Sequence, residues 1–148
     1  MKIIDRIRKT PPLALFALFA FAAGSARAAS THIVVHKDLT VSKLSPDDLE
    51  SIYLGKKTLW ESGAKIAPVI LVEDSPGGRE FIEQVLAKTV AQYRAYWKRR
   101  LFSGGGTVPR AFSSSAEIVD FVGKTPGAIG VIESPSKDER VKSVPLAK

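Results

Sequence analysis

The sequence predicts an α/β domain in which a mixed central sheet is flanked by helices. Amphipathic segments that start at helix-capping residues and stop at glycine or proline are typical of helices. Short apolar runs rich in β-branched residues are typical of strands, and they lie at residues 32–36, 66–72, 128–133 and 141–146. The predicted order is β-α-β-α-α-α-β-β. Because helical crossovers favour parallel pairing and the last two strands follow each other directly, the sheet is expected to be mixed.

The predicted helices have clear start signals. Ser45 is suited to an N-cap and Pro46 to the first helical position, and the two acids that follow complement the positive end of the helix. Capping boxes at residues 89–92 and 114–117 open two later helices. The strand at residues 66–72 is nearly all apolar, so we expect both of its faces to be covered in the middle of the sheet.

A candidate anion site lies in the turn at residues 75–79, which reads Ser-Pro-Gly-Gly-Arg between a strand and a helix. Free amides at a helix N-terminus attract anions, glycines allow close approach, and an arginine adds a forked contact. A serine at the start of a later helix could add a hydroxyl. The predicted oxyanion ligands are Ser75, Gly77, Gly78, Arg79 and Ser114. The alternatives are an ordinary turn with Arg79 paired to Glu83, and a serine that only caps its helix.

The first 28 residues are predicted to be a secretory signal peptide. A basic start precedes an apolar stretch at residues 11–23 and an Ala-Arg-Ala cleavage signature, so cleavage is expected after Ala28. Residues 29–148 then form a single periplasmic domain without membrane insertion. This part keeps 17 of the 22 basic and 14 of the 15 acidic residues, a net charge of +3 that suits a small anionic ligand. The absence of cysteine excludes disulfides and lipidated cysteine anchors.

Several segments together resemble the substrate-binding proteins of phosphate ABC transporters. They are residues 45–49, 52–56 with Trp60, 65–69, 75–80 and 126–130. The resemblance implies one lobe of the type 2 periplasmic-binding-protein fold. It also implies a solute-binding-type protein that binds phosphate or a related oxyanion for an ABC transporter, with an ABC permease or a second copy of the chain as further partners. In the family the anion-binding turn reads Ser-Gly-Thr followed by Arg. Here Gly78 stands where the Thr hydroxyl would be, and Pro76 removes an amide.

A second function stays open: an envelope interaction or sensory accessory module built on half a binding protein, without solute capture of its own. Its basis is the missing lobe and the altered turn. Enzyme activity is not expected, because the sequence has no nucleophile elbow and no metalloprotease signature. A metal site and a cofactor are not expected either, since the only histidines, His32 and His36, would lie about 13 Å apart on a strand.

Residues 98–100 (Lys-Arg-Arg) and nearby aromatic residues admit two interpretations. They could form a basic aromatic strip for nucleic acid or lipid head groups. Alternatively, the recurrence of Tyr93, Trp97 and Leu101 every four residues indicates a buried helix face beside a solvated basic one. The second interpretation is preferred, and no nucleic-acid partner is expected.

Overall fold

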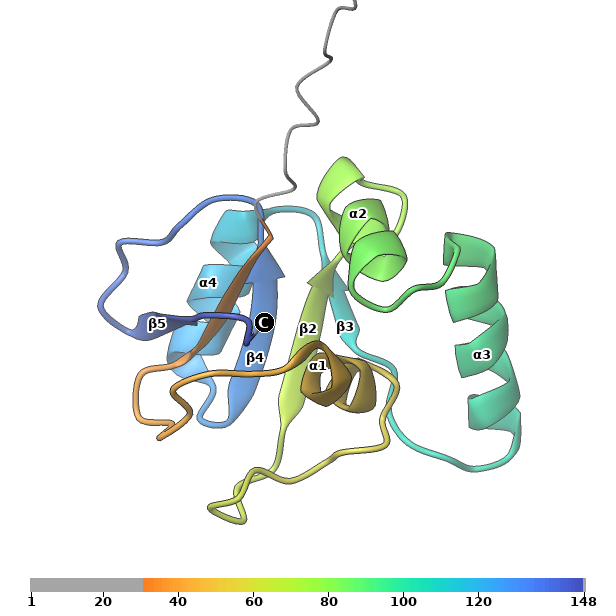
Figure 1. Ribbon diagram of the computed structural model, residues 1–148, viewed down its shortest axis with the longest axis horizontal. Helices are drawn as coiled ribbons and strands as arrows, with labels where there is room; N and C mark the ends of the chain where they lie inside the picture. Colours follow the sequence, from red (N-terminus) through yellow and green to blue (C-terminus); the bar gives the residue numbers. More distant parts are fainter. Residues whose placement is uncertain (1–30, 148) are drawn as a thin grey trace, which may run out of the picture.

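The computed structural model describes residues 31–147, so the predicted signal peptide lies outside the described residues. The elements follow one another along the chain as β1 (His32–His36), α1 (Pro46–Tyr53), β2 (Ala67–Leu71), α2 (Pro76–Gln84), α3 (Val90–Phe102), β3 (Arg110–Phe112), α4 (Ser115–Lys124), β4 (Ala128–Ile132) and β5 (Val141–Val144) (Figure 1). The predicted α/β class is confirmed. The three helix starts predicted from capping residues are also confirmed, and α2 begins within the turn at residues 75–79 with Ser75 as its N-cap.

The five strands of the described chain form one mixed sheet in the order β3-β2-β4-β1-β5. β2 is parallel to β3 and β4, and β1 is antiparallel to β4 and β5. The central strand is thus β4, and β2 lies beside it, one place from the position that we expected. β3 was not predicted, because its three residues lie at the sheet edge, are mostly exposed, and show no apolar run.

Helices cover both faces of the sheet, α1, α2 and α3 on one side and α4 on the other (Figure 1). The strands alternate accordingly: in β1, Ile33 and Val35 belong to the core beneath α1 to α3, whereas Val34 belongs to the core beneath α4. From β2 the chain crosses to the edge strand β3 through α2 and α3. From β3 it crosses back past β2 to β4 through α4. Because parallel crossovers are right-handed, two crossovers in opposite directions place their helices on opposite faces.

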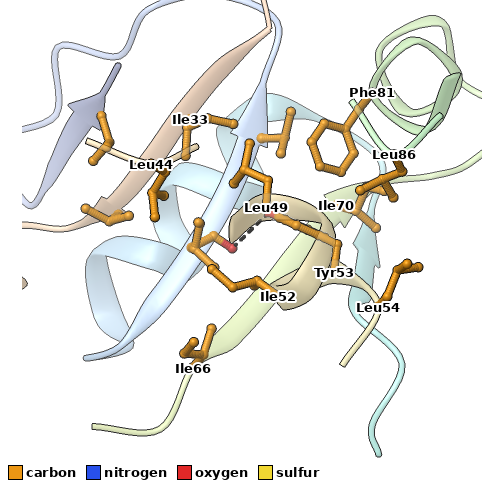
Figure 2. Packing of buried hydrophobic residues seen from close by; sticks show 14 of the residues in the cluster. Ile33, Leu44, Leu49, Ile52, Tyr53, Leu54, Ile66, Ile70, Phe81 and Leu86 are labelled. Carbon is orange, nitrogen blue, oxygen red and sulfur yellow. Dashed lines mark hydrogen bonds between the residues drawn. The ribbon is translucent and has the colours of Figure 1, made fainter. Parts of the chain in front are cut away.

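The larger core is organised around Tyr53 of α1 (Figure 2). Its ring is fully buried and meets Phe81 of α2 edge to face, with 4.7 Å between the ring centres. Its hydroxyl donates a hydrogen bond to the carbonyl oxygen of Val69 at 2.9 Å. One side chain therefore joins α1, α2 and β2, which fixes the start of α2 relative to the sheet.

The expected apolar face of α3 is only partly correct. Tyr93 and Trp97 are buried, as predicted, but Leu101 is 52% exposed. Trp97 packs closely against Gly55 at the end of α1. Since α3 continues beyond that contact, its last turn extends past the elements that would cover Leu101.

Candidate functional site

The candidate site lies at the carboxyl edge of the three parallel strands. β2 leads into the turn before α2, β3 leads into the start of α4, and β4 is followed directly by Glu133 (Figure 1). Ligands of open α/β sheets bind outside this edge, where helix N-termini are directed. The Glu133 amide donates to the hydroxyl of Ser115 at 3.1 Å, which ties the end of β4 to the start of α4. The fold therefore brings the turn at residues 75–79 and Ser114 to one edge.

Ser75 uses its hydroxyl within the fold. The oxygen Oγ donates to the carbonyl oxygen of Val72 at 2.6 Å and accepts from the Gly78 amide at 3.1 Å. This is the N-cap geometry that satisfies one of the free amides at a helix start. An incoming anion would have to compete with the Val72 carbonyl for the hydroxyl proton.

Gly78 is buried and has no room for a side chain. A Cβ placed there would lie 2.2 Å from the carbonyl oxygen of Val72. Because the contact is with backbone, it cannot be relieved by a rotamer change. The first turn of α2 thus depends on glycine at this position for its close approach to the end of β2.

Gly77 lies against a carboxylate. A Cβ on Gly77 would be 2.7 Å from Oε1 of Glu133. The second residue of a helix has no intrahelical partner for its amide, and a negative charge near that amide is stabilised by the helix dipole. The Glu133 carboxylate therefore lies beside the first turn of α2, where its negative charge would oppose a bound anion.

Arg79 is exposed and takes part in none of the ion pairs among the described residues. The alternative pairing with Glu83 is not formed. The neighbouring turn is held by another cation, since Arg94 of α3 contacts Glu73 and lies 2.8 Å from the carboxylate of Asp74. Arg79 is thus left available to an external oxyanion.

Ser114 caps α4 in the predicted manner. Its hydroxyl accepts from the amide of Glu117 at 3.3 Å. The Glu117 carboxylate in turn accepts from the amides of Ser113 and Ser114 at 2.9 and 3.1 Å. The side chains of Ser114 and Glu117 therefore satisfy the amides of Ser113, Ser114 and Glu117 at the start of α4.

Glu80 and Glu133 line a small cavity at the site. Neither was predicted as a site residue from the sequence. A cavity of about 100 Å³ is bounded by Gly77, Glu80 and Glu133, with Thr31, Leu71 and Ile132 among the other lining residues. The only signal for Glu133 in the sequence is its position directly after a buried strand. Its approach to Gly77 depends on β4 lying beside β2, which local sequence does not encode.

No family model matches the sequence, and no curated protein matches it either. Solved structures do match. An ABC-type phosphate transport receptor of Vibrio cholerae superposes with a TM-score of 0.59 at 23% identity, covering 78% of this chain and 45% of its own. A protein of Clostridium perfringens assigned as a phosphate ABC transporter substrate-binding protein, solved with bound phosphate, gives 0.63 at 26% identity and coverages of 78% and 44%.

PstS from Borrelia burgdorferi gives a TM-score of 0.60 at 14% identity, with 78% of this chain and 46% of its own chain covered. This chain has the fold of one lobe of these binding proteins. It spans less than half of their length. The resemblance predicted from the sequence is confirmed, as is the single-lobe fold. The Vibrio cholerae and Clostridium perfringens proteins are described as components of phosphate transport.

The close approach of Gly78 to Val72 explains why this turn departs from the family pattern at Gly78. The resemblance implied a threonine hydroxyl at this position, but here the backbone of Val72 fills the space that its Cβ would need. A threonine side chain would not fit at this position, so the turn has no hydroxyl donor there.

Proposed function

We propose that the protein is a periplasmic solute-binding-type protein whose ligand is phosphate or a related small oxyanion, delivered to an ABC transporter. The observation that carries the proposal is the convergence of the α2 and α4 N-termini at the carboxyl edge of the sheet. The fold shared with phosphate receptors supports the same ligand class. Within this site, the amide of Gly77 and the guanidinium of Arg79 are the proposed principal donors.

Binding by the single lobe is expected to be weak. Hydrogen bonds to a charged group contribute about 1.5 to 3 kcal/mol each, whereas association costs at least about 4 kcal/mol in lost freedom. Glu133 must also turn away from Gly77 before an anion can approach. Two such donors leave a net gain of at most about 2 kcal/mol, which corresponds to a Kd of roughly tens of millimolar.

The test is an NMR titration of the mature protein with phosphate and sulfate at constant ionic strength. Shifts should concentrate on the amides of residues 75–79 and should weaken in Arg79→Gln. The matched control is Lys37→Gln, an exposed cation that follows β1, which runs antiparallel to β4 and so ends at the opposite edge of the sheet. Absence of any localised shift at tens of millimolar anion would overturn the proposal.

The second candidate is an envelope interaction or sensory accessory module that does not capture solute. The observation in its favour is that carboxylates of the protein itself, Glu133 and Glu117, lie beside both helix N-termini. If the protein has this function, neither phosphate nor sulfate changes the NMR shifts of the amides of residues 75–79, even in Glu133→Gln. A second copy is the simplest partner, and sedimentation velocity over a range of concentrations would detect it.

A further inference from the structure

The last turn of α3 exposes two large apolar side chains. Leu101 is 52% and Phe102 is 84% exposed, and Phe102 is the most exposed of the large apolar residues in the described chain. Single exposed apolar residues are common on protein surfaces, but adjacent ones at a helix end form a patch. In Figure 1, α3 stands at the outer side of the molecule, away from the strands.

A cation shares this patch. Lys98, Leu101 and Phe102 are spaced i, i+3 and i+4, so they lie on one face of the helix. The helix is fixed to the body of the protein on its other sides: Trp97, one turn before Leu101, is buried, and the Tyr96 hydroxyl donates to the carbonyl oxygen of Leu54 at 2.7 Å. Because α3 is anchored in this way, it cannot rotate to bury the apolar pair.

The charged side chains of α3 are all basic. The helix carries four basic residues and no acid. Arg94 pairs with acids of the turn before α2, and Arg100 donates to the carbonyl oxygen of Gly55 at 2.8 Å. Lys98 and Arg99 are exposed and form no ion pair with the described residues.

We propose that this end of α3 docks on the surface of an anionic lipid bilayer. Leu101 and Phe102 enter the boundary between head groups and acyl chains, while Lys98 and Arg99 contact lipid phosphates. A bilayer surface offers negatively charged head groups directly above hydrocarbon. Amphipathic helices that carry cations beside aromatic residues bind at this boundary. The glycines at residues 104–106 follow the patch without bulky side chains.

This docking is peripheral. In the described residues no helix is long and apolar enough to cross a membrane. The proposal is also independent of oxyanion capture, because it uses none of the residues at the carboxyl edge of the sheet.

The test is flotation of the mature protein with vesicles. Binding is expected to vesicles of equal phosphatidylglycerol and phosphatidylcholine at low salt, and not to phosphatidylcholine alone. The double variant Leu101→Ser with Phe102→Ser should bind roughly tenfold or more weakly, because the buried apolar area is lost. Lys98→Gln with Arg99→Gln should also bind roughly tenfold more weakly, and added salt should weaken the wild type similarly.

Two controls separate this surface from general stickiness and from the anion site. Leu59→Ser removes an apolar side chain of matched exposure, 54%, from the segment between α1 and β2, and should bind vesicles like the wild type. Arg79→Gln should bind vesicles normally even though it weakens phosphate binding. Circular dichroism and thermal melts confirm that every variant is folded, which is expected because all altered side chains are exposed.

Three outcomes would overturn the proposal. The first is a wild type that stays unbound with phosphatidylglycerol vesicles, and the second is an equal loss in Leu59→Ser. The third is concentration-dependent self-association that disappears in the Leu101→Ser, Phe102→Ser variant without any vesicle binding. That result would assign the patch to a contact between two copies of the chain.

Discussion

Gly78 and Val72 are in closer contact than any side-chain-bearing residue would allow. A Cβ on Gly78 would lie 2.2 Å from the Val72 carbonyl oxygen and 2.9 Å from its carbonyl carbon. The contact joins the first turn of α2 to the residue that follows β2. It places the helix start against the sheet and excludes a hydroxyl-bearing side chain from that position.

Restoring the threonine expected from the binding-protein resemblance should therefore destabilise the protein. Gly78→Thr is expected to lower the free energy of unfolding by about 2 kcal/mol or more, because overpacking against backbone cannot be relieved by side-chain movement. Urea unfolding measures the change. The matched control is Glu83→Thr on the exposed side of the same helix, which should change stability by less than about 0.5 kcal/mol. Equal effects of the two substitutions would contradict the close contact.

Glu133 should oppose anion binding at α2. In Glu133→Gln the negative charge beside Gly77 is removed while the size of the side chain is kept, so phosphate is expected to bind roughly threefold to tenfold more tightly. Isothermal titration or NMR shifts provide the Kd. Glu139→Gln is the control, since Glu139 is an exposed acid outside the site cavity. Unchanged affinity in Glu133→Gln would show that this carboxylate does not compete with the ligand.

Two buried tyrosines should respond differently to loss of their hydroxyl groups. Tyr53 donates to the carbonyl oxygen of Val69 at 2.9 Å, whereas the Tyr93 hydroxyl has no hydrogen-bond partner among the described residues. Tyr53→Phe is expected to cost about 1 kcal/mol of unfolding free energy. Tyr93→Phe should be neutral or slightly stabilising, because it removes a polar atom that is buried without a partner. Chemical denaturation of both variants tests the pair, and a larger loss in Tyr93→Phe would refute this assignment.

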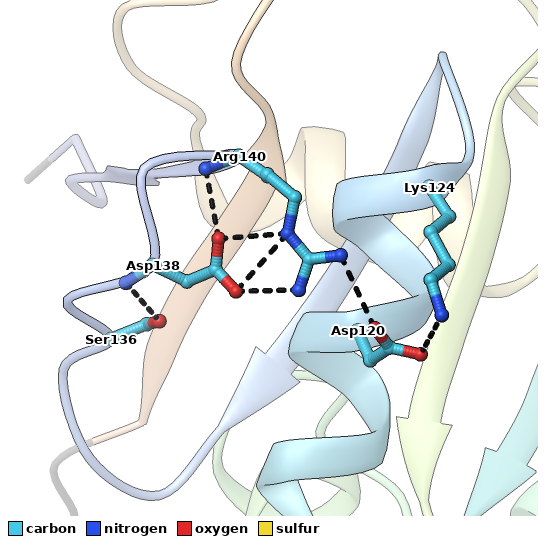
Figure 3. Close-up of polar contacts among 5 residues, drawn as sticks. All are labelled: Asp120, Lys124, Ser136, Asp138 and Arg140. Carbon is cyan, nitrogen blue, oxygen red and sulfur yellow. Dashed lines mark hydrogen bonds and ion pairs between the residues drawn. The ribbon is translucent and has the colours of Figure 1, made fainter.

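An ion-pair network joins α4 to the segment before β5 (Figure 3). Arg140 holds Asp138 through Nη2 at 2.7 Å and Nε at 3.0 Å, and reaches Asp120 of α4 through Nη1 at 3.2 Å. Lys124 contacts the other oxygen of Asp120 at 2.7 Å. Hydrogen bonds from the Arg140 side chain, followed by that from its amide, lower the pKa of Asp138 from 3.8 to about 2.

This lowered pKa predicts the pH dependence of the network. A carboxyl group whose pKa falls on folding adds stability above its unfolded pKa, and that stability is lost as the pH falls through the folded value. Asp138→Asn should therefore be less stable than the wild type at neutral pH, with the difference shrinking between pH 3.8 and about pH 2. Urea midpoints across this range measure the effect. The control is Glu139→Gln, which alters an exposed neighbour outside the ion pairs of the described chain. Its stability difference from the wild type should not shrink over this pH range.

Local sequence determined the elements but not all of their partners. Each predicted helix start has its Ser or Thr cap in the structure, because capping is a contact between residues three apart. β3 could not be predicted because it is an exposed edge strand of three residues without an apolar pattern. It forms by pairing with its neighbour β2. Leu101 was assigned to the core because periodicity does not show where the covering elements end.

The sequence alone determined the fold class, the helix caps and the position of the Ser-Pro-Gly-Gly-Arg turn, because these depend on short-range chemistry. What surrounds that turn depends on tertiary packing. Placing β4 beside β2 brings Glu133 against Gly77, and the close approach of α2 to β2 leaves no space at Gly78. Both contacts join residues from different elements. Their geometry follows from packing across the sheet, which no local pattern encodes.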